Sequence, residues 1–221
     1  MTVPKTLTAF LVVGLLSVAP AAADVIFFNS FGPGDSFDSS RGTFFGFMEG
    51  EEGAPSSTFS RAMPFVAAAT GTLNDVELPL EFPFSFDGPG SLVVNLFAAD
   101  SGLPGALLES FTDSTPATGH AIFTFPSSAH PTLTGGSLYF VEATATNQAD
   151  GVWNLTNEPP HTVTDFYRFN GGQWQTGTRD FSAAFRVSGT ADVVPEPACL
   201  LLVGTGLGLL ARRSLPHGKC E

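Results

Sequence analysis

Three histidines in the central part of the chain are the first residues to test for catalysis or metal binding: His120, His130 and His161. Each is isolated, because none has a second His or a Cys at the spacing of a metal-ligand pair. The sequence also has no G-x-S-x-G turn and no phosphate-binding P-loop. We therefore expect a protein that is not an enzyme and that needs no organic cofactor.

The segment from Gly32 to Ser40, GPGDSFDSS, is the best metal candidate in the sequence. Asp35 and Asp38, together with loop carbonyls, offer the hard oxygen ligands that calcium prefers. The spacing differs from that of an EF-hand loop, and Asp and Ser are also ordinary turn residues. Calcium binding and a plain turn both stay open, and the turn is the favoured interpretation.

Aromatic residues raise a second kind of site, a surface that binds carbohydrate. The candidates are Trp174, Tyr167 and Trp153. Trp174 follows a glycine turn, a position at which exposure is open to it, whereas Trp153 lies in an apolar strand and is predicted in the core. Large aromatic side chains also fill cores, and for the two tryptophans we favour core packing over a sugar platform.

The charge of the central region excludes some partners. Between Asp24 and Val194 there are five arginines, no lysine and nineteen Asp and Glu residues, which gives −14. Such a domain would be repelled by phosphate backbones, so nucleic-acid binding is not expected. Glycoside hydrolysis needs two carboxylates a short distance apart. The sequence does not indicate which pair would lie that close, so a glycoside-active enzyme is the least favoured function.

The central region is predicted to be all-β. Residues 76–81 alternate apolar and polar, which is typical of a half-buried strand. Further strands are predicted at 92–97, 122–125, 138–141, 166–169 and 183–187, with turns between them, including one at Asn170-Gly171. This pattern predicts an antiparallel, jelly-roll-like β-sandwich with Leu78, Val94, Leu96, Val141 and Phe185 buried.

The N-terminal end is typical of a secretory signal peptide. Lys5 is followed by an apolar run from Leu7 to Leu16, and Ala21 and Ala23 occupy the two small-residue positions of a cleavage site. Signal peptidase is expected to cut before Asp24. The mature chain is therefore predicted to leave the cytoplasm.

The C-terminal end has three parts in order. Pro195-Glu196-Pro197 precedes an apolar segment, 198–211, and Arg212-Arg213 follow it. As a helix this segment would rise about 21 Å, which is short of the roughly 30 Å hydrocarbon core. The arginines would hold its far end in the cytoplasm. A transient membrane stop is therefore predicted.

These three parts resemble the PEP-CTERM sorting signal. The resemblance implies a Gram-negative bacterium that makes exopolysaccharide, in which an exosortase recognises the Pro-Glu-Pro motif and removes the helix. The central region is similar to the choice-of-anchor β-sandwich families, most of all the R type. Short stretches spread over the region carry this second resemblance: NSFGPGDSF (29–37), SGLPGALLESF (101–111), LTGGSLYFVEA (133–143), VWNL (152–155), NGGQW (170–174) and AFRVSG (184–189).

The predicted organisation follows from these observations. It comprises a signal peptide (1–23), an exported β-sandwich (24–190), a linker with the Pro-Glu-Pro motif (191–197), a transmembrane sorting helix (198–211) and a basic cytoplasmic tail (212–221). We expect a non-enzymatic cell-surface or matrix protein associated with exopolysaccharide or biofilm, which contacts signal peptidase, exosortase and, transiently, the inner membrane. A carbohydrate-binding module for exopolysaccharide is the main alternative.

Overall fold

The computed structural model describes residues 23–50, 55–82, 91–113, 119–146, 149–157 and 163–192. All of them belong to one compact unit, Ala22–Asp192. Several predictions lie outside the described residues: Ala21 of the cleavage site, the Pro195-Glu196-Pro197 motif, the helix at 198–211, Arg212, Arg213 and His161.

The described residues form an all-β structure without helices, as predicted, and every strand pairing is antiparallel. The strands are β1 (Asp24–Asn29), β2 (Asp38–Met48), β3 (Ser57–Val66), β4 (Gly71–Phe82), β5 (Ser91–Asp100), β6 (Leu103–Asp113), β7 (Gly119–Pro126), β8 (Thr132–Leu133), β9 (Leu138–Thr146), β10 (Asp150–Leu155), β11 (Val163–Phe169), β12 (Gln175–Arg179) and β13 (Arg186–Ala191).

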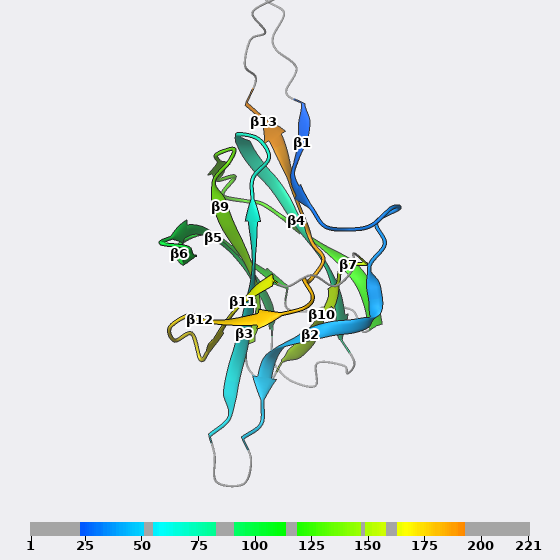
Figure 1. Ribbon diagram of the computed structural model, residues 1–221, viewed down its shortest axis with the longest axis vertical. Coiled ribbons are helices and arrows are strands. Elements are labelled where there is room, and N and C mark those ends of the chain that lie inside the picture. Colours follow the sequence, from blue (N-terminus) through cyan, green and yellow to red (C-terminus); the bar gives the residue numbers. More distant parts are fainter. Residues whose placement is uncertain are drawn as a thin grey trace, which may run out of the picture. The chain divides into compact units, whose positions relative to one another are not determined.

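The strands join into one sheet in the order β1-β13-β4-β10-β2-β3-β9-β5-β6. β7 adds to β4, and β11 adds to β3 and carries β12 (Figure 1). The short β8 also pairs with β4. The largest core cluster takes side chains from strands near both ends of this order, such as Phe27 of β1 and Phe111 of β6. A flat sheet would keep these residues apart, so the sheet must curl around its core.

The alternation of apolar residues explains this core. Leu78, Val94, Leu96, Val141 and Phe185 are all buried, which confirms the prediction for each of them. Full burial of one such side chain contributes about 1.5–3 kcal/mol. Since no cysteine lies between Asp24 and Val194, this burial rather than disulfides must hold the domain together.

The strand predicted at 183–187 begins later than expected, at Arg186. The preceding residues make their hydrogen bonds elsewhere. Ala183 forms an isolated bridge with Leu155, the Ala184 N–H donates to the Asn154 carbonyl, and the Phe185 N–H donates to the Ser30 hydroxyl. The apolar run therefore marks buried residues correctly but places the strand's start three residues too early.

Candidate functional site

The hairpin formed by β11 and β12 places polar and aromatic side chains beside β3. Its turn matches the prediction, because Asn170 and Gly171 have φ values of 51° and 66°, which Asn and Gly tolerate. Side chains alternate along a strand, so Asp165, Tyr167 and Phe169 of β11 share one face. Tyr167 pairs with Arg61, and Phe169 pairs with Phe59, so these two residues of β3 lie on the same face.

On this face Asp165 is held by two arginines. Arg61 Nη1 donates to both carboxylate oxygens at 2.5 Å, and Arg179 Nε donates to Oδ2 at 2.6 Å. The side chains of Arg61 and Asp165 are each 3% exposed, whereas that of Arg179 is 34% exposed. Burial lowers the pKa of the Arg61 guanidinium, and the hydrogen bond with Asp165 opposes this shift without cancelling it. The cluster contains two cations and one anion.

Aromatic rings adjoin these charges. The ring centroid of Phe59 lies 5.9 Å from that of Tyr167 and 5.1 Å from that of Phe169. The Arg61 guanidinium carbon lies 4.9 Å from the centroid of the Phe59 ring. Phe169 is 39% exposed, so the aromatic group reaches the surface. It combines apolar contact area with nearby charged groups, which is the usual composition of a binding pocket.

A pocket of about 290 Å³ opens here, and we call it the β11 pocket. Its lining residues are Phe59, Asp165, Tyr167, Gly177, Thr178 and Arg179.

The opposite face of the hairpin carries Trp174. Arg168 donates to both oxygens of the buried Glu142 at 2.7 and 2.8 Å, and Asn95 donates to Glu142 Oε2 at 2.7 Å. The Arg168 guanidinium carbon lies 4.6 Å from the centroid of the Trp174 ring, and the Trp174 and Phe97 rings are nearly perpendicular with their centroids 6.1 Å apart. Trp174 therefore covers an ion pair of equal and opposite charges, on the side of the hairpin away from Tyr167.

Trp153 lies in the core. It is 0% exposed, and its indole N–H donates to the Ala184 carbonyl at 2.7 Å. Because Tyr167 and Trp174 occupy opposite faces, the three aromatic residues singled out in the sequence do not share a surface. Tyr167 lines the β11 pocket.

The two aspartates considered for calcium are bound to different arginines. Asp35 accepts from Arg186 Nη1 at 2.7 Å, and Arg186 also donates to Glu77. Asp38 accepts from the Ser40 hydroxyl at 2.6 Å and from Arg41 Nε at 2.6 Å. The Ser40 hydroxyl first, then Arg41 and the Ser40 N–H, lower the pKa of Asp38 to about 2. These contacts use oxygens that calcium would need, and they favour the turn interpretation.

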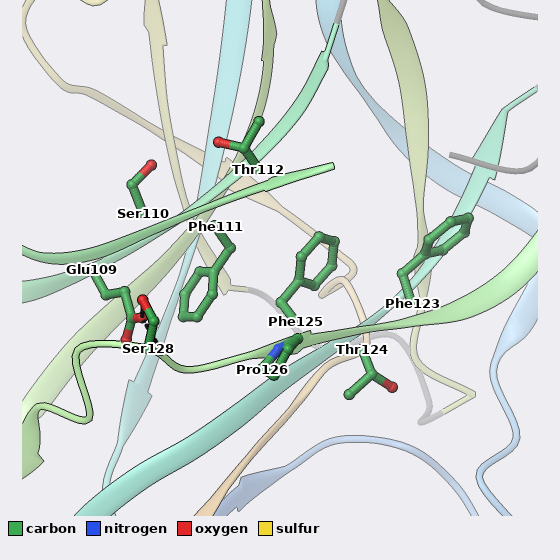
Figure 2. A pocket seen from close by; sticks show the side chains of 9 residues that line it. All are labelled: Glu109, Ser110, Phe111, Thr112, Phe123, Thr124, Phe125, Pro126 and Ser128. Atoms are coloured by element: carbon green, nitrogen blue, oxygen red, sulfur yellow. Dashed lines mark hydrogen bonds between the residues drawn. The ribbon is translucent and has the colours of Figure 1, made fainter. Parts of the chain in front are cut away.

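The ends of the two edge strands β6 and β7 enclose a second pocket, of about 320 Å³. Figure 2 shows Phe111 and Phe125 reaching toward one another across it, whereas Thr124 points to the other side of its strand. The centroids of the two phenylalanine rings lie 6.2 Å apart. We call this the β6–β7 pocket, and it is lined by Glu109, Ser110, Phe111, Thr112, Phe123, Thr124, Phe125, Pro126 and Ser128.

Glu109 is the charged residue of the β6–β7 pocket, and hydroxyl and amide groups hold it. It accepts from the Ser127 hydroxyl at 2.5 Å and from the N–H groups of Ser128 and Ala129 at 2.6 and 3.0 Å. Burial by itself would raise the pKa of Glu109, but these hydrogen bonds outweigh burial, so the pKa lies below its ordinary value. The carboxylate fixes the turn after β7 and brings a negative charge to the pocket.

The remaining candidates do not form a site within the described residues. His120 Nε2 lies 3.3 Å from Glu81, and His130 Nδ1 lies 3.0 Å from the Leu73 carbonyl. In the described ranges no three His, Cys, Asp or Glu residues come together as a metal site would require. The same part of the chain contains no helix of the length and apolar character that crossing a membrane requires.

Sequence reasoning missed most of the β11 pocket. The alternation of Asp165, Tyr167 and Phe169 could have placed three residues on one face. The contribution of Phe59 and Arg61 depends on the register between β3 and β11, which pairs residues more than a hundred positions apart. No local pattern carries that information.

Comparison with known proteins adds no relative: no protein-family model matches this chain, and the search of curated proteins finds no significant match.

Proposed function

We propose that this chain is an exported, non-enzymatic protein of the cell surface or extracellular matrix of a Gram-negative bacterium. The observation that carries the proposal is the order of the three C-terminal parts: Pro195-Glu196-Pro197, the apolar segment 198–211 and Arg212-Arg213. An exosortase would cut at the Pro-Glu-Pro motif and release the domain. Prolines at both ends of this motif oppose helix continuation, so the motif would stay extended and accessible to the enzyme.

The first strand fits the expected signal cleavage. β1 begins at Asp24, and Asp24 pairs with Thr190 of β13. A cut before Asp24 would leave all of β1 in the mature protein. It would remove one backbone acceptor of the ladder, the Ala23 carbonyl that binds the Ala191 N–H at 3.0 Å. We further propose that the curled sheet is a jelly-roll-like β-sandwich of the choice-of-anchor kind.

Intact-mass measurement on extracellular and membrane fractions of cells that make the full chain tests the sorting proposal. We expect an extracellular form that begins at Asp24 and lacks the residues from about Ala198 onward. A Glu196→Ala variant should accumulate uncleaved in the membrane, because the recognition motif is altered. The matched control is Asp192→Ala, which removes an acidic residue just before the motif and should be released normally.

Two results would contradict the proposal. One is a single membrane-bound species that still carries Arg212, Arg213 and Cys220. The other is normal release of the Glu196→Ala variant.

Carbohydrate binding is the second candidate function, and the β11 pocket favours it. Tyr167 presents a half-buried ring there beside charged groups, so the pocket offers both a stacking surface and polar contacts. In this alternative the exported domain binds exopolysaccharide directly.

A further inference from the structure

The arginines of the described residues differ in how many carboxylates neutralise them. Arg41 binds Asp38, and Arg168 binds Glu142, one cation to one anion. Arg186 binds two carboxylates, those of Asp35 and Glu77. A different balance holds beside the β11 pocket, where Arg61 and Arg179 share the single carboxylate of Asp165. In an acidic domain, this cluster has an excess of positive charge.

Both arginines of the cluster have N–H donors that remain unused by the described residues. Arg61 Nε is buried and finds no hydrogen-bond partner in the part of the chain that the structure describes. Arg179 uses Nε for Asp165, and among the described residues nothing accepts a hydrogen bond from its two terminal nitrogens. Arg179 also lines the pocket and is partly exposed, so these nitrogens are available to a ligand. The cluster has the charge and the donors for one more carboxylate.

The walls of the pocket limit what can carry that carboxylate. Phe59 and Tyr167 supply aromatic surface, and Phe169 extends this surface to the outside. The apolar face of a pyranose ring packs well against such rings, and Tyr167, which lines the pocket, also carries a hydroxyl group that can bond to a sugar hydroxyl. A uronic acid residue combines a pyranose ring and a carboxylate in one unit.

We infer that the β11 pocket binds a uronic acid residue of an acidic polysaccharide, with the carboxylate on Arg179 and the sugar ring against Tyr167 and Phe59. This inference rests on the carbohydrate-binding function proposed above. The net charge of −12 on the chain opposes the approach of a polyanion. At physiological ionic strength, however, charges are screened over about 8 Å, so the groups at the pocket decide binding.

Calorimetric titration of the full chain, in a detergent without a sugar headgroup, tests the inference. The probes are a short oligomer of glucuronic acid, the glucose oligomer of the same length and linkage, and a glutamate peptide of the same charge. We expect the glucuronic acid oligomer to bind more tightly than either of the others. Arg179→Gln should weaken this binding about tenfold or more, because a charge-assisted hydrogen bond is lost.

The matched control is Arg41→Gln, which changes the net charge equally at an exposed arginine bound to Asp38, and its affinity should be unchanged. Phe169→Ala, at an exposed ring that can be truncated without opening the core, should also weaken binding of the sugar. Melting curves establish that each variant is folded.

Several results would overturn the inference. Equal binding of the glucose oligomer would remove the role of the carboxylate but leave carbohydrate binding intact, whereas binding of neither oligomer would contradict both. Binding of the glutamate peptide as tight as that of the sugar would show a site for acidic peptides instead. Equal losses in Arg179→Gln and Arg41→Gln would show that only the net charge matters.

Discussion

The β6–β7 pocket and the β11 pocket are alike in size, both have aromatic side chains in their walls, and each contains a buried carboxylate. The partners of that carboxylate differ. Glu109 accepts hydrogen bonds from neutral hydroxyl and backbone N–H groups, so these partners do not neutralise its negative charge. Two guanidinium groups bind Asp165, so the net charge of this group of three side chains is positive.

This difference shows that the groups around a carboxylate, more than the carboxylate itself, decide what a pocket can bind. The first pocket would repel an anion, and the hydrogen bonds of Glu109 serve the turn at Ser127–Ala129. The β11 pocket has N–H donors of Arg179 that no described residue uses. Three changes test this comparison.

The largest effect is expected for Asp165→Ala. This change leaves Arg61 and Arg179 without their shared anion, and Arg61 is nearly fully buried. Loss of one partner of a buried ion pair costs about 3–5 kcal/mol of unfolding free energy. Chemical denaturation measures it. The control is Asp38→Ala, whose partner Arg41 is 55% exposed, and its effect should be much smaller. Equal effects of the two changes would show that burial of the cluster is unimportant.

A smaller loss is expected for Glu109→Gln. The amide keeps one oxygen as an acceptor, but it brings an NH₂ group to face the Ser127 hydroxyl or the N–H groups of Ser128 and Ala129. Loss of hydrogen bonds to a charged group costs about 1.5–3 kcal/mol. The same denaturation experiment measures this loss. A variant as stable as the original protein would mean that the charge of Glu109 is not needed to fix the turn.

The smallest effect concerns pH. Because the folded-state pKa of Glu109 is lowered, its contribution to stability is complete above the ordinary pKa of 4.5 and is lost as the pH falls from there through the folded-state value. The unfolding free energy of the original protein should therefore drop more steeply on acidification below about pH 4.5 than that of Glu109→Gln. Parallel curves for the two proteins would contradict the lowered pKa.

The fold was predictable from local patterns to a large extent. Alternation marked Leu78 and Val94 as buried, and the Asn170-Gly171 turn was placed correctly, because period-two burial and positive φ are properties of short segments. The start of β13 was placed too early, because the apolar residues 183–185 indicate burial and not the hydrogen bonds that define a strand.

The candidate site was much less predictable. Tyr167 was one of the three aromatic candidates, and Trp153 lies in the core as predicted, but no sequence pattern indicated that Trp174 lies on the other face of the hairpin from Tyr167. The residues that give the β11 pocket its charge, Arg61 and Arg179, carried no signal in the sequence. Their significance depends on how many anions surround them, which is a property of the packed structure.

By itself the sequence determined the all-β class of the domain and the burial of its predicted apolar side chains, because both depend on the order of apolar residues and turns along a short stretch of chain. The expected export and sorting signals likewise rest on local order at the two ends. The pairing of β3 with β11 was decided only in the tertiary structure, and with it the meeting of Arg61, Asp165 and Arg179. Cross-strand register joins residues that are distant in sequence, and the balance of charge in a pocket is set by that register.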